Sequence, residues 1–229
     1  MPERFLHRMV QLLIGLFLFG IGVSFLISSD LGASSWDVLT QGISYHVPLS
    51  FGTITVIMSG IVLLLWIPLR QKPGIGTISN ALLVGPVVDL GLYLIPVVEA
   101  LWIRVLFIGI GILMMGFATG LYIGSRFGPG PRDGLMTGLH RVTGRPIWMV
   151  RVTLELTVVA LGWMLGGIVG IGTIAAAILI GPVVQFFMRL FYIPLSSDAE
   201  SNVVASVSNE QPQSSTEEVV TLRESIRSG

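Results

Sequence analysis

The chain has 229 residues, of which 52% are hydrophobic and 11% are charged, and its formal net charge is zero. Its mean hydropathy is +0.84. Soluble domains carry about 25% charged residues, so this composition predicts a polytopic membrane protein with the lipid bilayer as its main partner. The neutral balance gives no support for nucleic-acid binding. The sequence contains no cysteine, which excludes disulfides, thiolate metal sites and thiol catalysis.

The predicted fold class is all-α, because six apolar stretches are each long enough to cross a hydrocarbon core of about 30 Å. The stretches cover 9–27, 51–69, 74–95, 101–123, 147–165 and 170–193. A basic segment, 1–8, precedes them. The polar segment 196–229 follows them, and we expect it to be disordered because it has too little apolar surface to offset its chain entropy. A cleaved signal peptide is the alternative interpretation of the first stretch.

The chain contains an internal duplication. Gly-Ile-Gly-Thr begins at Gly74 and again at Gly170, and Gly-Pro-Val-Val begins at Gly85 and again at Gly181. Both pairs are 96 positions apart. The same offset relates Gly20 to Gly116, Gly32 to Gly128, Asp37 to Asp133 and Gly42 to Gly138. Because the match reaches back to the first stretch, we retain that stretch as a span. The predicted repeats are 9–97 and 98–195.

The basic residues predict the orientation of the spans, because short cytoplasmic loops collect Lys and Arg. With both termini placed inside, eleven of the 13 basic residues are cytoplasmic, Arg104 is outside and Arg151 lies within the fifth span. The cytoplasmic residues are Arg4, Arg8, Arg70, Lys72, Arg126, Arg132, Arg141, Arg145, Arg189, Arg223 and Arg227. Three spans per repeat is an odd number, so the two copies cross the membrane in opposite senses. This inverted-repeat plan is typical of secondary transporters, whose sites lie near the midplane.

Four motifs resemble the YczE/YitT-type bacterial integral membrane proteins, most closely the YczE-like branch. The motifs are Leu31-Gly32-Ala33-Ser34-Ser35-Trp36-Asp37, the paired Gly-Ile-Gly-Thr, Phe127-Gly128-Pro129-Gly130-Pro131-Arg132-Asp133-Gly134 and Arg151-Val152-Thr153-Leu154-Glu155. The likeness covers 8–194. It implies a small multi-pass protein of the bacterial plasma membrane, with transport as a plausible role.

Two polar intervals, 30–50 and 124–146, each predict a short helix that is either interfacial or re-entrant. Asp37 and Asp133 occupy the third position of these helices, where a carboxylate is favourable. In the first interval Ser34 and Asp37 form a capping-box pattern. The two aspartates are therefore either simple caps or residues of mirror-related gates.

The repeated glycine motifs predict helix starts and matching helix breaks. Thr77 and Thr173 are expected to cap the helices that begin there. Pro86 and Pro182, which follow Gly85 and Gly181, remove one backbone hydrogen bond each. Breaks at equivalent places in two halves indicate a midplane site, whereas the alternative is a plain packing kink.

Ionisable groups inside spans are the strongest candidates for substrate binding or ion coupling, because a charge at the bilayer centre costs about 2.5–3.5 kcal/mol. Asp89 is a candidate proton or cation site, and its repeat equivalent is Gln185. Glu155 lies one turn from Arg151, so the two form either a structural salt bridge or part of the site. Asn80 completes these candidates.

Our leading functional hypothesis is a secondary transporter or exporter of an unidentified small molecule that works by alternating access. The alternative is a non-transporting accessory protein that scaffolds a biosynthetic or export complex. We expect no enzyme and no cofactor or metal, because no catalytic dyad or metal motif can be placed inside the spans and His7, His46 and His140 are far apart. The Gly116-xxx-Gly120 face of the fourth span allows either a homodimer or close packing within the monomer.

Overall fold

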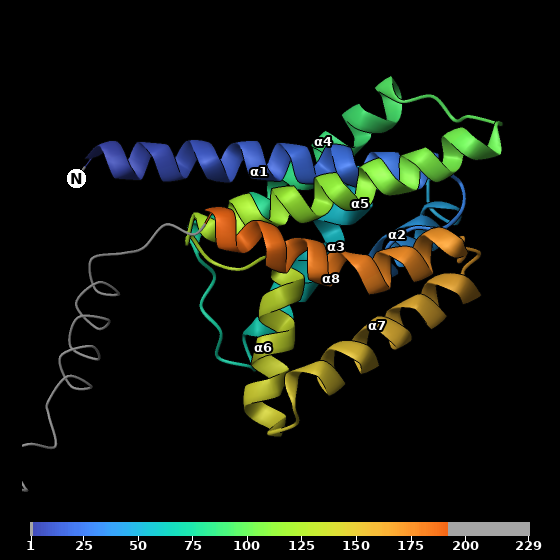
Figure 1. Cartoon of the computed structure of the whole chain (residues 1–229). Helices are drawn as coiled ribbons and strands as arrows, with labels where there is room; N and C mark the ends of the chain where they lie inside the picture. Colours follow the sequence, from blue (N-terminus) through green and yellow to red (C-terminus); the bar gives the residue numbers. More distant parts are fainter. Residues whose placement is uncertain (1, 192–229) are drawn as a thin grey trace, which may run out of the picture. The chain divides into compact units, whose positions relative to one another are not determined.

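The computed structural model describes residues 2–191, and within this part of the chain the secondary structure is eight α-helices (Figure 1). They are α1 (Pro2–Ser28), α2 (Ser35–Ser44), α3 (Phe51–Trp66), α4 (Ile75–Leu94), α5 (Leu101–Gly124), α6 (Pro131–Thr143), α7 (Ile147–Met164) and α8 (Ile171–Phe191). The all-helical fold is confirmed for these residues. The predicted disordered tail, 196–229, and the last two residues of the sixth predicted span lie outside them.

The duplication is visible in the backbone as well as in the sequence. α2, α3 and α4 begin 96 positions before α6, α7 and α8, and α1 ends 96 positions before α5 ends. The turns that follow α1 and α5 also correspond. Asp30 and its equivalent Arg126 have φ values of 53° and 57°, and Gly32 and Gly128 have φ values of 111° and 115°. A glycine adopts this left-handed conformation without steric cost, which explains why both turns use it.

Five of the described helices, α1, α4, α5, α7 and α8, are long and apolar enough to cross a membrane. α3 is also apolar but has 16 residues, about 24 Å of helix, so it is shorter than the second predicted span, 51–69. Large apolar side chains project outward from these helices. They include Ile61, Leu64, Leu65, Leu82, Leu90, Leu106, Leu113, Leu156, Leu161, Ile174, Ile178 and Phe186. Such a surface fits a lipid environment better than water.

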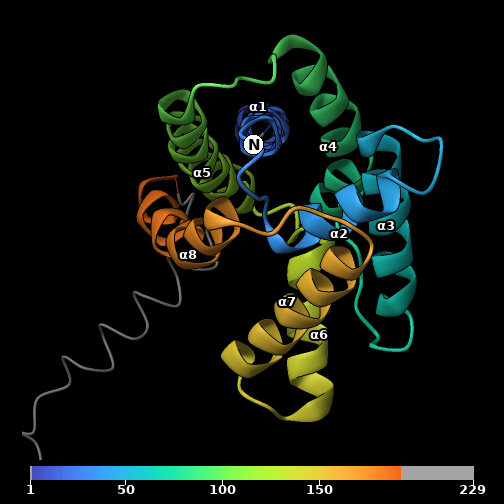
Figure 2. The ribbon, with the colours of Figure 1, turned by 90° about the vertical axis from the view of Figure 1, so that its right-hand side faces the viewer.

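α1 is the most buried of the long helices, and Figure 2 shows it almost end-on between α4 and α5. It runs antiparallel to α5. Near its start, Arg8 Nε donates to the carbonyl of Ser125 at 2.8 Å, just beyond the end of α5. Near its other end, Asp30 pairs with Arg104 from the first turn of α5 at 3.4 Å. Two equivalent helices therefore point in opposite directions.

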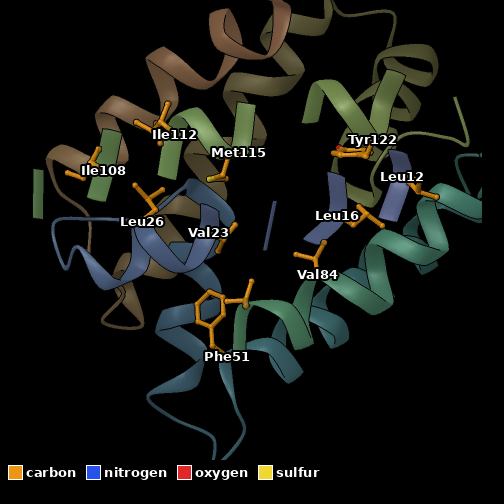
Figure 3. Packing of buried hydrophobic residues seen from close by; sticks show 12 residues of the cluster. Leu12, Leu16, Val23, Leu26, Phe51, Val84, Ile108, Ile112, Met115 and Tyr122 are labelled. Carbon is orange, nitrogen blue, oxygen red and sulfur yellow. The ribbon is translucent and has the colours of Figure 1, made fainter. Parts of the chain in front are cut away.

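The main hydrophobic core surrounds α1 (Figure 3). It contains Leu12, Leu16, Val23, Leu26, Phe51, Val84, Val88, Ile108, Ile112, Met115, Tyr122 and Ala176. These residues come from α1, α3, α4, α5 and α8, so the two repeats share a single core.

Glycines allow equivalent helices of each repeat to pack closely. Gly20 of α1 lies against Val87 of α4, and its equivalent Gly116 of α5 lies against Val183 of α8. A Cβ on either glycine would meet the facing valine. The glycine face of α5 is thus occupied inside the monomer by α8.

The loop after the first helix of each repeat binds the start of the last helix of the other repeat. Gly76 N donates to the carbonyl of Phe127, and the equivalent Gly172 N donates to the carbonyl of Leu31, both at 2.9 Å. In the same exchanged manner α2 packs against α7 and α6 packs against α3. The repeats are interlocked, and neither is an independent bundle.

The prolines lie inside helices that continue past them. α4 runs without interruption through Pro86, and α8 runs through Pro182. The predicted interruptions are therefore not helix breaks. Each proline costs one hydrogen bond, and packing of the surrounding turns keeps the helix intact.

Candidate functional site

A cavity of about 270 Å³ lies among the eight described helices, and each helix or its preceding cap contributes residues to the lining. Most of the lining is made of repeat equivalents. The equivalent pairs are Phe19 and Met115, Val23 and Thr119, Ser34 and Gly130, Ser35 and Pro131, Trp36 and Arg132, Asp37 and Asp133, Thr55 and Arg151, Ser59 and Glu155, Asn80 and Ala176, Val84 and Ile180, and Val88 and Val184. Both halves of the sequence therefore contribute matching positions to the cavity.

The remaining lining residues all come from the second repeat. They are Tyr122, Ile123, Met136, Ala177, Gly181 and Gln185. The cavity therefore extends further along the second repeat than along the first. The difference lies between two equivalent walls, which are formed by α3 and α4 in the first repeat and by α7 and α8 in the second.

In the first repeat the wall is closed, because α3 and α4 pack at backbone contact. A Cβ on Gly85 would meet the carbonyl oxygen of Gly52, and a Cβ on Gly52 would meet the carbonyl oxygen of Gly85. In the second repeat α7 and α8 make no comparable packing within residues 2–191. A Cβ on Gly181 would meet no described atom within 4 Å.

Asp89 seals the closed wall. Its Oδ1 accepts a hydrogen bond from Gly52 N at 2.7 Å, and its Oδ2 accepts one from Ser50 Oγ at 2.6 Å. Ser50 is the N-cap of α3. A carboxylate of α4 thus caps the start of α3, where the helix dipole favours negative charge. Its equivalent in the open wall, Gln185, lines the cavity.

Arg151 and Glu155 line the cavity from α7 and form the salt bridge expected from their spacing. Arg151 Nε donates to Glu155 Oε1 at 2.9 Å. The carboxylate is the more buried partner, with 23% of the Glu155 side chain exposed against 47% for Arg151. This pair leaves no net charge in its part of the cavity.

Asp37 is a nearly buried carboxylate with both oxygens occupied. Its side chain is 2% exposed. Oδ2 accepts a short hydrogen bond from Ser34 Oγ, and Oδ1 pairs with Arg132 at 3.4 Å. The Arg132 guanidinium also stacks over the Trp36 ring, 5.3 Å from its centroid. Ser34 Oγ therefore donates to the aspartate side chain and makes no hydrogen bond to the backbone of the helix start. The capping box predicted from the sequence is wrong at this position.

Asp133 occupies the equivalent position in α6, with different partners. Oδ2 accepts a hydrogen bond from the Tyr122 hydroxyl at 3.0 Å, and Asp133 forms no salt bridge with a described residue. Asn80 Nδ2 lies close by, because a Cβ on Gly130 would be 3.1 Å from Tyr122 Oη, 3.3 Å from Asp133 Oδ2 and 3.6 Å from Asn80 Nδ2.

Burial raises the pKa of the Asp133 carboxyl above its ordinary value, although the Tyr122 hydroxyl, Arg151 and Arg132 act in the opposite direction. Asp133 lies in α6, which is not among the five helices that are long and apolar enough to cross a membrane. Removing water from around a carboxylate disfavours its charged form, whereas the hydroxyl donor and the arginines favour it.

The structure brings some of the predicted residues together and places others elsewhere. The cavity is lined by Asn80, Arg151, Glu155, Gln185, Gly181, Asp37 and Asp133. Outside the lining are Asp89, Gly85, Pro86, Pro182, Thr77 and Thr173. Trp36, Arg132 and Tyr122 also line the cavity, although they are not among the site residues predicted from the sequence. For Trp36 and Arg132 the sequence contained an indication of a site, because an aromatic and a cationic side chain stand at equivalent positions of the two repeats.

The two threonines lie at helix starts. Thr77 Oγ1 accepts from Gly74 N at 3.2 Å, and Thr173 Oγ1 accepts from Gly170 N at 3.3 Å. Thr77 also donates to the carbonyl of Pro129 at 2.7 Å, which ties the start of α4 to the loop before α6. Thr77 therefore joins the two repeats, whereas the hydrogen bond of Thr173 with Gly170 stays within its own helix start.

The arrangement offers polar and ionic binding inside an apolar shell. Within the described residues, no group of three His, Cys, Asp or Glu side chains is placed to hold a metal ion. The cavity instead contains three carboxylates and two guanidinium groups, together with hydroxyl and amide groups. Such a site can bind and orient a small molecule.

Comparison with known proteins gives the family. A family of unknown function, DUF6198, matches residues 6–189. The chain belongs to this family. It is 40% identical over 187 residues to an uncharacterized protein of Haemophilus influenzae, covering 80% of this chain and 86% of the relative. It is 30% identical over 188 residues to the uncharacterized membrane protein YczE of Bacillus subtilis, covering 81% and 87%. The uncharacterized protein YyaS of Bacillus subtilis is 29% identical over 181 residues, covering 77% and 90%.

These relatives confirm the resemblance predicted from the motifs. Together with the five long apolar helices, they identify a multi-pass membrane protein. No solved structure matches the chain.

Proposed function

We propose that this protein is a secondary transporter of a small molecule and not an enzyme, and that it works by alternating access between two inverted repeats across the bacterial plasma membrane. Each repeat would contribute three crossings, with α3 as the short second crossing of the first repeat. The termini would lie in the cytoplasm. Asp89 and Glu155 are our candidates for coupling transport to an ion gradient.

The antiparallel arrangement of α1 and α5 supports the inversion of the repeats. Equivalent helices of an inverted pair must cross the membrane in opposite senses, as these two do. A cavity lined by equivalent residues of both halves fits the midplane site of such transporters.

The single observation that carries the proposal is the difference between the two equivalent walls. The α3–α4 wall is closed at backbone contact and sealed by Asp89, whereas α7 and α8 stand apart beside Gly181. In the proposed orientation the closed wall faces outward and the open wall faces the cytoplasm. A cavity with one sealed side and one open side is the geometry that alternating access requires.

Alternating access is tested with a single cysteine at Ser59, which lines the cavity. The natural chain has no cysteine to interfere. We expect Ser59→Cys in whole cells and in inverted vesicles to react with a membrane-impermeant thiol reagent from both sides, because both states are visited. Gly60→Cys is the control, since Gly60 is exposed on the outer face of α3 with open space around it and should stay unreactive in lipid. Labelling of Ser59→Cys from one side alone would reject the transport cycle and favour the accessory role.

The orientation has a separate test at two exposed positions, His46 after α2 and His140 in the last turn of α6. We expect His46→Cys to react only from outside the cell and His140→Cys only from the cytoplasm, because an inverted pair places the two polar intervals, 30–50 and 124–146, on opposite faces. Quantifying the labelled fraction in cells and in inverted vesicles distinguishes the two faces. If both positions react from the same side, the repeats are not inverted.

A further inference from the structure

The cavity contains one carboxylate, Asp133, that forms no salt bridge with a described guanidinium. Asp37 pairs with Arg132, and Glu155 pairs with Arg151. Asp133 Oδ2 accepts a hydrogen bond from the Tyr122 hydroxyl, whereas Oδ1 accepts no hydrogen bond from residues 2–191. The two arginines of the site are therefore paired with other acids, and the lining has one negative charge in excess when Asp133 is ionised.

An uncompensated carboxylate in a low-dielectric cavity favours a cation and repels an anion. Within the described chain Asp133 belongs to no group of three His, Cys, Asp or Glu side chains that could hold a metal ion, so we consider an organic cation. A cavity of about 270 Å³ has room for an organic molecule. Its surroundings indicate what the rest of that molecule would be.

The wall beside Asp133 is apolar and aromatic. The Tyr122 ring that donates to Asp133 packs edge-to-face on Phe19, with ring centroids 6.2 Å apart. Val84 and Met115 continue this wall. Aromatic faces attract organic cations, and the aliphatic side chains accept an apolar body. Asn80 adds one amide close to the carboxylate.

We infer that the cavity binds a small organic cation with an apolar body, and that the Asp133 carboxylate is its counter-ion. Tyr122 positions that carboxylate, leaving Oδ1 for the ligand. Asp37, the repeat equivalent, has both oxygens occupied and serves the structure. This inference rests on the proposed function in taking the cavity as the substrate site, and it adds the substrate class.

The test is equilibrium binding of radiolabelled benzylammonium to the full-length protein purified in detergent at pH 7. Benzyl alcohol, which has the same ring and nearly the same size without the charge, is the competitor. We expect saturable benzylammonium binding and little displacement by benzyl alcohol. Asp133→Asn should weaken binding about tenfold or more, because it removes a charge-assisted hydrogen bond.

Asp30→Asn is the matched control. It removes a carboxylate outside the cavity, and asparagine tolerates the positive φ of 53° at that position. We expect its binding to equal that of the natural protein. If Asp133→Asn does not fold, the unaltered protein is treated with an apolar carbodiimide, and benzylammonium should protect Asp133 from modification.

Equal binding of benzyl alcohol, unchanged binding by Asp133→Asn or a lack of protection would overturn the inference. An absence of benzylammonium binding would also overturn it and leave Asp133 as a proton site. These outcomes are distinguishable from failure of the transport proposal, because Ser59→Cys would still react from both sides of the membrane.

Discussion

Gly85→Ala is expected to destabilise the protein by about 1–3 kcal/mol, the usual cost of forcing an extra methyl group into a packed interface. The added Cβ would meet the carbonyl oxygen of Gly52, which is backbone and cannot rotate away. α3 and α4 would have to separate, and the seal made by Asp89 with Gly52 N would weaken. Thermal melting in detergent should show a loss of several degrees, since about 1 kcal/mol corresponds to roughly 2–4 °C for a protein of this size.

Gly181→Ala is the control for Gly85→Ala. It makes the same change at the equivalent position, where the new Cβ meets no described atom within 4 Å. Both glycines precede a proline, so local backbone effects are matched. Alanine is the better helix former by about 1 kcal/mol, and Gly181→Ala should melt at or slightly above the natural temperature. Equal losses from both variants would contradict the difference between the walls.

Gly85→Ala should also increase labelling of Ser59→Cys from outside the cell. Separation of α3 from α4 opens the wall that Asp89 seals, and the proposed orientation places this wall outward. The double variant is compared with Ser59→Cys alone in intact cells. An unchanged outside labelling rate would show that the α3–α4 joint does not restrict access.

Arg132→Met is expected to cost about 3–5 kcal/mol of stability, because it leaves a buried carboxylate without its partner. Asp37 is 2% exposed, and its Oδ1 has Arg132 as its cationic partner. Methionine keeps much of the apolar volume of arginine, so the loss would report the charge. Unfolding in detergent by denaturant or heat measures the effect. Adding Asp37→Asn to Arg132→Met should restore part of the lost stability, since a neutral amide no longer needs a counter-ion.

Arg104→Met is the matched comparison for the second ion pair. Arg104 pairs with Asp30, whose side chain is 44% exposed, at the same distance of 3.4 Å. Water solvates Asp30 when the arginine is removed, so the expected cost is about 0–1 kcal/mol. A similar loss from Arg104→Met and Arg132→Met would mean that burial of Asp37 does not determine the energy of its pair.

The differences between the repeats concentrate where the chemistry lies. Asp89 and Gln185 are equivalent, but the first seals a wall and the second lines the cavity. Asp37 and Asp133 are equivalent, but only Asp37 has an arginine, because Arg132 reaches across from the other repeat. Equivalent helices begin 96 positions apart in the two repeats, whereas the side chains at these equivalent positions differ.

The sequence alone was sufficient for the local and periodic properties. Apolar length predicted the long helices, the 96-residue offset predicted equivalent elements, and spacing predicted the Arg151–Glu155 pair, because each depends on residues close together in the chain. It also pointed to Asp37 and Asp133 as helix-start residues. It overestimated the second crossing, since α3 ends at Trp66, and it expected helix breaks at prolines that packing accommodates.

Only the tertiary structure decided which candidates meet. Arg132 reaches Asp37 and Tyr122 reaches Asp133 across loops and between helices, while Asp89 turns to the start of α3 and away from the cavity lining. A one-dimensional pattern records that a charge lies within a span, but the direction in which it points depends on how neighbouring helices cross. The interlocking of the two repeats sets those crossings, and it determines which carboxylate of the cavity lining forms no salt bridge with an arginine.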